Sequence, residues 1–131
     1  MADHAAKLGA SKSASTLLVL FIPSVDRQSK PIAQGRWVDE ALKVLGGLFG
    51  GATAFPKGRG VWRDDAKGGA LVYDKPVVIQ CYTSERLITQ SADELREFLV
   101  RMGTETNQGA VGLVIDRDYL EIEFPLKDDQ E

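Results

Sequence analysis

Apolar and polar residues along this chain follow two periods, and each period predicts one kind of element. An almost unbroken apolar run within 16–24 predicts a central strand that is covered on both faces. From Gln34 onward, apolar residues recur at helical spacing and predict a first helix: Trp37, Val38, Ala41, Leu42, Leu45, Leu48 and Phe49. Gly46 and Gly47 each weaken a helix by about 1 kcal/mol relative to alanine, so we expect this helix to end there or just beyond.

A second helix is predicted to begin at Ser91. Ser91 and Glu94 have the spacing of a capping box, in which a hydroxyl and a carboxylate each satisfy a free backbone amide at a helix start. One apolar face follows at helical spacing and is formed by Leu95, Phe98, Leu99 and Met102.

The remaining apolar runs predict two hairpins. Short strands at 60–63 and 70–73 flank a loop rich in aspartate and glycine, and the second strand resumes at 77–82. The strands at 110–115 and 119–124 turn through residues 116–118. In chain order these elements predict an α+β fold, namely a ferredoxin-like βαββαβ antiparallel sheet with two helices on one face and an extra C-terminal strand.

The chain of 131 residues is long enough for one continuous core. Residues 1–15 are small and polar and are expected to form a flexible N-terminal tail, while 127–131 form a charged C-terminal tail. Between them, 16–126 are expected to form a single α+β domain.

Two helices cover only one face of such a sheet, yet the strands at 17–22, 77–82 and 111–115 are apolar on both faces. Each large aliphatic side chain left in water forgoes about 1.5–3 kcal/mol of burial. We therefore expect a homodimer that packs through the helix-free sheet face. The alternative is that the N-terminal tail, the loop at Pro56 or the last strand covers that face.

Charge and apolar run length exclude several classes of partner. A net charge of −3 argues against nucleic acid, because polyanion affinity depends on many lysine and arginine contacts. The longest fully apolar run, 17–23, is far shorter than the roughly 18 residues a spanning helix needs, so no membrane partner is expected. We read the chain as cytoplasmic, with its lone Cys81 buried as a small hydrophobic residue.

Few side chains offer catalytic or metal chemistry. The only histidine, His4, lies in the tail, which argues against histidine-dependent catalysis and a zinc site, and no cofactor is expected. Asp116 and Asp118, near Glu121 and Glu123, are weak candidates for a metal site, as are Asp64 and Asp65. Turn chemistry is the simpler interpretation for these aspartates, and the two glutamates fit the solvated face of an edge strand.

Residues 49–65, FGGATAFPKGRGVWRDD, combine backbone freedom with functional side chains. The glycines could let backbone amides hold an anion, with ligand-binding candidates at Lys57, Arg59, Trp62, Arg63 and Tyr73. The spacing matches no phosphate-loop or dinucleotide motif, so the favoured interpretation of these glycines is a tight helix-to-strand turn followed by a surface loop.

The same stretch carries a resemblance to a family. Gly50, Gly51, Thr53, Gly60 and Trp62 resemble a GG-x-T followed by G-x-W pattern of small uncharacterised bacterial domains. The resemblance implies a ferredoxin-like bacterial protein and supplies no activity.

Three functions fit these observations. The favoured hypothesis is a homodimeric binding or assembly module, which leaves open whether the chain is an enzyme. One alternative is a small histidine-independent hydrolase or isomerase with a pocket near the glycine-rich loop, using carboxylates and Arg63 or Tyr73. The other is a nucleotide or nucleic-acid binder that uses Lys57, Arg59, Trp62 and Arg63.

Overall fold

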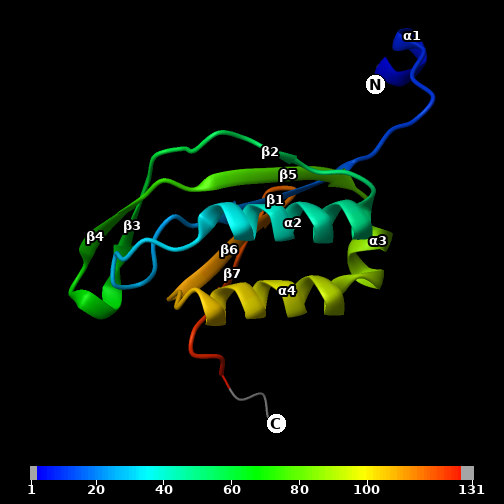
Figure 1. Cartoon of the computed structure of the whole chain (residues 1–131). Coiled ribbons are helices and arrows are strands. Elements are labelled where there is room, and N and C mark those ends of the chain that lie inside the picture. Colours follow the sequence, from blue (N-terminus) through cyan, green and yellow to red (C-terminus); the bar gives the residue numbers. More distant parts are fainter. Residues whose placement is uncertain (1–2, 128–131) are drawn as a thin grey trace.

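The computed structural model describes residues 3–127. They form a sheet, a layer of helices packed on it and a small separate hairpin (Figure 1). The main elements in chain order are β1 (Thr16–Ile22), α2 (Gln34–Phe49), β2 (Thr53–Ala54), β5 (Val77–Thr83), α4 (Ala92–Glu105), β6 (Ala110–Ile115) and β7 (Asp118–Glu123). The smaller elements are α1 (His4–Leu8), β3 (Gly60–Asp64), the 3-10 turn η1 (Asp65–Lys67), β4 (Ala70–Asp74) and α3 (Glu85–Gln90).

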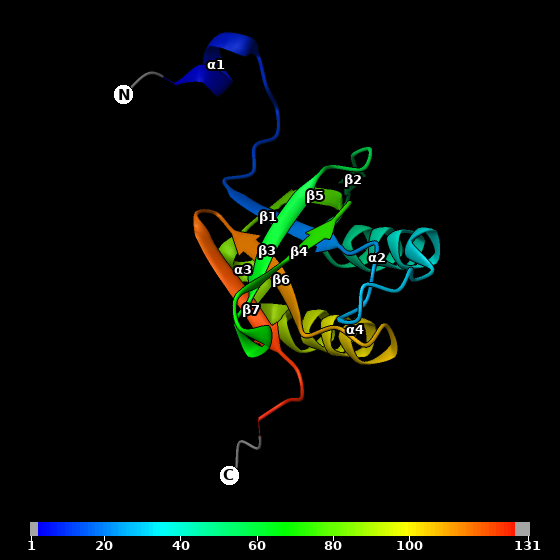
Figure 2. The same ribbon diagram turned by 90° about the vertical axis from the view of Figure 1, so that its left-hand side faces the viewer.

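Five strands form one antiparallel sheet in the order β2-β5-β1-β6-β7. Both long helices, α2 and α4, lie on the same side of it and leave its other side, the helix-free face, covered by neither (Figure 2). The predicted α+β class, an antiparallel sheet with both helices on one face, is therefore confirmed.

Alternation along β1 explains how the core forms. Leu18, Leu20 and Ile22 are fully buried toward the helices, because every second side chain of a strand points to the same face. They pack with Trp37 and Leu45 of α2 in one core cluster, which also includes the apolar face predicted for α4. Trp37 is thus a core residue, as its helical spacing predicted.

Helix α2 continues two residues beyond its paired glycines. It ends at Gly50, which adopts a left-handed conformation (φ 94°) and donates its N–H to the carbonyl of Gly46. That backbone conformation is the reason for glycine at this position.

The hairpin β3–β4 differs from the prediction, because it forms its own two-stranded sheet. The edge of the main sheet is instead the two-residue strand β2, which pairs with Gln80 and Ile79. Bonds at the hairpin base explain the separation: Ser24, just after β1, donates its N–H to the Asp74 carboxylate, and Lys75 donates its N–H to the Ser24 hydroxyl. The predicted strand at 60–63 exists, but it leaves the sheet at this point.

The predicted capping box is wrong. A short helix, α3, already begins at Glu85, and its start is capped by Ser84, whose hydroxyl accepts the N–H of Leu87 at 3.2 Å. Ser91 lies at the junction of α3 and α4, where it is buried and its side chain makes no cap hydrogen bond. Because its N–H already bonds to the carbonyl of Leu87, the chain approaches α4 as a continuing helix rather than as an extended segment.

The predicted N-terminal tail contains α1, whose described residues bury no side chain. Only Lys127 of the predicted C-terminal tail lies within the described residues. Among residues 3–127, no helix has the length and apolar character needed to cross a membrane.

Candidate functional site

The predicted ligand residues of the hairpin lie on two opposite faces. Trp62 pairs with Val72, whereas Arg63 pairs with Leu71 on the other face, which also carries Tyr73. Arg63 is held by an exposed ion pair with Asp65, with 2.6 Å between Nε and Oδ1. The structure therefore does not bring Trp62 together with Arg63 and Tyr73 in one pocket.

The loop before the hairpin uses its glycines for local structure. Gly58 donates its N–H to the carbonyl of Pro76 at 2.8 Å, and Gly60 packs against the ring of the same proline. Lys57 and Arg59 are exposed in this loop. The turn interpretation accounts for these glycines without a bound anion.

The candidate metal residues also have a structural role. Asp116 has a positive φ of 56° in the turn between β6 and β7, and its carboxylate accepts the N–H of Leu17 at 3.0 Å. Within residues 3–127, no group of three or more histidine, cysteine, aspartate or glutamate side chains is arranged to hold a metal ion. Turn chemistry is the role that the geometry gives Asp116.

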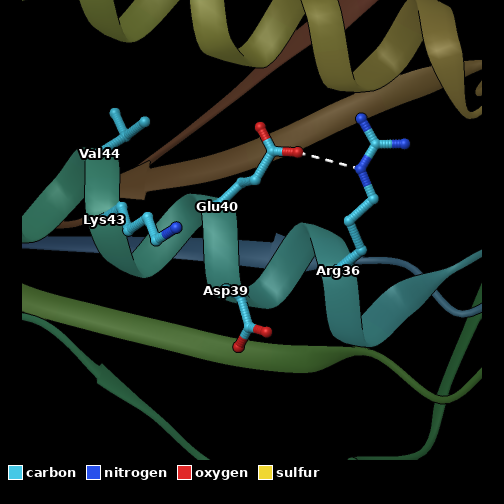
Figure 3. A pocket seen from close by; sticks show the side chains of 5 residues that line it. All are labelled: Arg36, Asp39, Glu40, Lys43 and Val44. Atoms are coloured by element: carbon cyan, nitrogen blue, oxygen red, sulfur yellow. Dashed lines mark hydrogen bonds and ion pairs between the residues drawn. The ribbon is translucent and has the colours of Figure 1, made fainter.

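An open hollow of about 560 Å³ lies on α2 and is lined by charged side chains (Figure 3). Its lining residues are Arg36, Asp39, Glu40, Lys43 and Val44. Glu40 accepts hydrogen bonds from Arg101 of α4 at 2.8 Å and from Arg36 at 3.1 Å. Arg101, and after it Arg36, lowers the pKa of Glu40 below its usual value.

These charged side chains mainly form contacts between α2 and α4. Arg36 and Arg101 also lie over the Trp37 ring, at 4.7 Å and 5.3 Å from its centroid. A smaller hollow of about 310 Å³ lies beside them, between α2 and α4. Since the arginines and Glu40 satisfy one another, we assign this surface a structural role. Neither hollow is lined by a residue of the glycine-rich stretch 49–65.

A different pair of polar groups lies on the helix-free side of the sheet. Tyr119 on β7 pairs with Val114, and Glu121 pairs with Gly112, so both side chains share that face. The Tyr119 hydroxyl donates to the Glu121 carboxylate at 2.9 Å. The phenol ring lies directly over Gly112, where any Cβ would collide with it. Glycine at this position thus lets the ring lie flat on the sheet.

The surroundings of Tyr119 keep it protonated. Partial burial, together with the hydrogen bond to Glu121, raises the pKa of Tyr119 to about 12. Across physiological pH the pair therefore presents a neutral phenol, its aromatic ring and a carboxylate. A ring face beside a carboxylate is a chemical arrangement that attracts organic cations.

The part of the helix-free face formed by β1 and β5 is mainly apolar, as the sequence predicted. Leu17, Val19 and Phe21 of β1 lie opposite Tyr82, Gln80 and Val78 of β5, and Tyr82 is 59% exposed. Tyr119 is exposed to a similar degree, at 58%. The helix-free face therefore combines an apolar floor, formed by β1 and β5, with the polar Tyr119–Glu121 pair at the β7 edge.

Sequence reasoning missed Tyr119 and treated Glu121 as a solvated edge residue. The available signal was the alternation of β7, which places residues 119, 121 and 123 on one face, combined with a glycine on the neighbouring strand. The register that aligns Gly112 with Glu121 follows from the pairing of Ile115 with Asp118, whereas the sequence placed the turn at 116–118 and so did not give this register.

Comparisons with known proteins identify a related fold. No protein-family model matches the chain, and no curated protein sequence is significantly similar. Among solved structures, a phage SAM lyase in complex with S-methyl-5′-thioadenosine has a TM-score of 0.67 and 14% sequence identity, covering 90% of this chain and 98% of that chain. The phage SAM lyase in its apo state has a TM-score of 0.62 at 14% identity, covering 90% and 96%. At this identity the similarity establishes a shared fold.

The comparisons correct the favoured functional hypothesis. Both matched structures are of an enzyme, which contradicts the prediction of a binding or assembly module. Of the alternatives drawn from the sequence, the small histidine-independent enzyme agrees better with this finding.

Proposed function

We propose that this protein is a small histidine-independent enzyme that binds S-adenosylmethionine (SAM) and cleaves it as a lyase. The observation that carries the proposal is the fold match, which spans 90% of this chain and 98% of the phage SAM lyase. The site we propose is the Tyr119–Glu121 pair on the helix-free face, together with the apolar floor beside it.

The chemistry of the ligand fits this pair. SAM carries a positively charged sulfonium and an ammonium group, and an aromatic ring face with an adjacent carboxylate attracts such cations. Tyr119 supplies the ring and orients the Glu121 carboxylate through its hydroxyl. The apolar side chains of β1 and β5 would contact the uncharged parts of the ligand.

The reaction consistent with the phage enzyme's bound compound breaks a carbon–sulfur bond. S-methyl-5′-thioadenosine is SAM without its four-carbon amino-acid chain, so the bond between sulfur and that chain breaks and its electron pair stays on sulfur. If the substrate's own carboxylate displaces the sulfur, the four-carbon fragment leaves as a lactone and no protein base is needed. A site without histidine is compatible with this route.

Physical reasoning assigns Glu121 to binding rather than to bond breaking. The positive charge on sulfur disappears during cleavage, so a carboxylate near the sulfonium stabilises the bound substrate more than the transition state. Its removal should therefore act mainly on KM, while the rate depends on how the site orients the substrate.

The experiment is incubation of the purified chain with SAM, with S-methyl-5′-thioadenosine measured by chromatography and mass spectrometry. We expect formation of this thioether, and we expect Glu121→Gln to raise KM by about 10- to 100-fold, since hydrogen bonds to charged groups contribute about 1.5–3 kcal/mol.

Glu123→Gln is the matched control, because Glu123 lies on the same strand and the same face, opposite Ala110. It should leave KM within about twofold. Absence of the thioether, and of any SAM-dependent shift in the melting temperature of the wild-type protein, would refute the proposed function.

Further expectations from the sequence belong with this proposal. We infer that the sheet is ferredoxin-like, since the order β2-β5-β1-β6 brings the first strand between the third and fourth of a βαββαβ unit. We also propose that the protein acts in the cytoplasm and forms a homodimer through its helix-free face. The bacterial resemblance, and ligand contacts by Lys57, Arg59, Trp62, Arg63 and Tyr73, remain predictions.

A further inference from the structure

We propose that Gln80 and the two aromatic residues beside it, Phe55 and Tyr82, form the subsite that binds the adenine base of the substrate. This subsite rests on the function proposed above, because it divides the same face of the sheet into two parts. The Tyr119–Glu121 pair at the β7 edge holds the charged groups of SAM, and β5 holds the base.

Gln80 is a polar residue in a mainly apolar part of the sheet. It pairs with Val19 on one side and with Thr53 on the other, so the three side chains share the helix-free face. The amides of the buried Gln34 and Gln108 donate to backbone carbonyls. The half-buried Gln80 amide has no hydrogen-bond partner of this kind among residues 3–127. Its N–H donors and its carbonyl oxygen are therefore available to a ligand.

Two exposed aromatic rings flank Gln80 on this face. Tyr82 lies two residues further along β5 and is 59% exposed. Phe55 follows β2, which lies along β5 (Figure 1); it is 42% exposed, and its N–H donates to the carbonyl of Val78. Successive residues on one face of a strand lie about 7 Å apart, so a base that stacks on either ring can reach the Gln80 amide.

The separation between Gln80 and the charged end of the site suits one SAM molecule. The Tyr119 ring lies over Gly112 of β6, and β1 lies between β6 and β5. Two strand spacings place β6 about 10 Å from β5. In SAM the ribose and its 5′ carbon separate adenine from the sulfonium, so the sugar would lie over the apolar side chain of Val19.

A glutamine amide gives such a subsite a preference for adenine. It can donate to a ring nitrogen and accept from the N6 amino group of the base at the same time. A purine without the amino group would leave the Gln80 carbonyl oxygen unpaired, which costs binding free energy. An aromatic surface without Gln80 would stack on any base and would not make this distinction.

Adenosine is the probe for the subsite, because it carries the base and the ribose but neither the sulfonium nor the amino-acid chain. Its binding can therefore be measured by calorimetry without the reaction. We expect Gln80→Leu and Tyr82→Ala each to raise the Kd of adenosine about 10-fold or more. Gln28→Leu, at an exposed glutamine of the loop before α2, is the matched control and should leave Kd within about twofold.

Purine riboside, which is adenosine without its N6 amino group, tests whether Gln80 contacts the base directly. The wild-type chain should bind it about 3- to 10-fold more weakly than adenosine, whereas the Gln80→Leu variant should bind both equally. A variant that only disturbs the fold would weaken both ligands and keep their ratio. That result, or an unchanged Kd of adenosine in Gln80→Leu, would overturn the subsite.

Turnover of SAM separates this inference from the proposed function. If the thioether forms and Gln80→Leu raises both the KM for SAM and the Kd of adenosine, both are supported. If the thioether forms while Gln80→Leu changes neither constant, the subsite is wrong and the lyase assignment stands. If adenosine binds through Gln80 but no thioether forms, the reaction is wrong and an adenine-nucleoside site remains. A wild-type chain that does not bind adenosine overturns the subsite outright.

Discussion

At the scale of single residues, the contact between Tyr119 and Gly112 organises the proposed site. The ring lies flat because the neighbouring strand has no Cβ beneath it, and the hydroxyl then reaches Glu121. The sequence gives the residue types but not the register in which the strands pair. For this reason the Tyr119–Glu121 pair was not predicted as a site, whereas Trp62 and Arg63 were. Residues adjacent in sequence on a strand point to opposite faces.

The raised pKa of Tyr119 makes a prediction about alkaline pH. A free tyrosine titrates near 10, and Tyr119 titrates at about 12 in the folded chain. Its contribution to stability is therefore fully present below pH 10 and is lost as the pH rises from 10 through 12. The absorbance of tyrosinate should show a titration step of Tyr119 at a pKa of about 12.

Two substitutions should remove that late titration by different routes. Tyr119→Phe deletes the phenol hydroxyl, so the titration step of Tyr119 disappears. Gly112→Ala pushes the ring off the sheet, so Tyr119 returns toward a pKa near 10. If the pKa of Tyr119 stays raised in the Gly112→Ala variant, then that raised pKa does not depend on the contact between the ring and Gly112.

At the scale of elements, two helical glycines with different surroundings give a second prediction. The Phe124 ring occupies the space where Gly103 of α4 would carry a Cβ, and Val111 closes the site from another side. Gly103→Ala should therefore destabilise the chain by about 1–3 kcal/mol through overpacking, measured by urea unfolding.

Gly47 of α2 is the matched control. Nothing lies within 4 Å of a Cβ added there, so Gly47→Ala should stabilise the helix by up to about 1 kcal/mol. If both alanine variants unfold at the same urea concentration, packing of Phe124 on α4 is not what constrains residue 103.

Elements were predicted best where the pattern of burial is strong. The apolar stripe of α2 has the residues expected of it, because it buries a continuous face. The hairpin β6–β7 also forms, with its first strand as expected and its second strand at Asp118–Glu123, one residue earlier than the expected 119–124. The start of α4 was correctly assigned to Ser91, but the capping box expected there does not form. The preceding helix α3, capped by Ser84, leads directly into Ser91 and was not predicted from the sequence.

At the scale of the whole molecule, the sequence predicted the layers but not the position of the hairpin. The bonds from Ser24 and Lys75 that fix its base join residues about fifty positions apart, and no local pattern reveals such contacts. The two-residue strand β2 is likewise too short to have a period. The proposed site depends on the sheet register, so it was hidden for the same reason.

Opening of the sheet can be measured by the reactivity of the Cys81 thiol. Cys81 on β5 is 3% exposed, and burial raises the pKa of its thiol. We expect a thiol reagent to modify it only at the rate of global unfolding, with a rate that rises in urea as the folded population falls. Fast modification in native buffer would show that β5 opens locally at Cys81, next to the residues that pair with β2.

The two borders of the main sheet restrict what kinds of assembly are open to this protein. One border is the two-residue β2, and the other is β7, whose exposed residues include Asp118, Glu121 and Glu123. Short strands and rows of charge hinder the addition of strands from other chains. Growth into fibrils through backbone pairing at either border is thereby disfavoured.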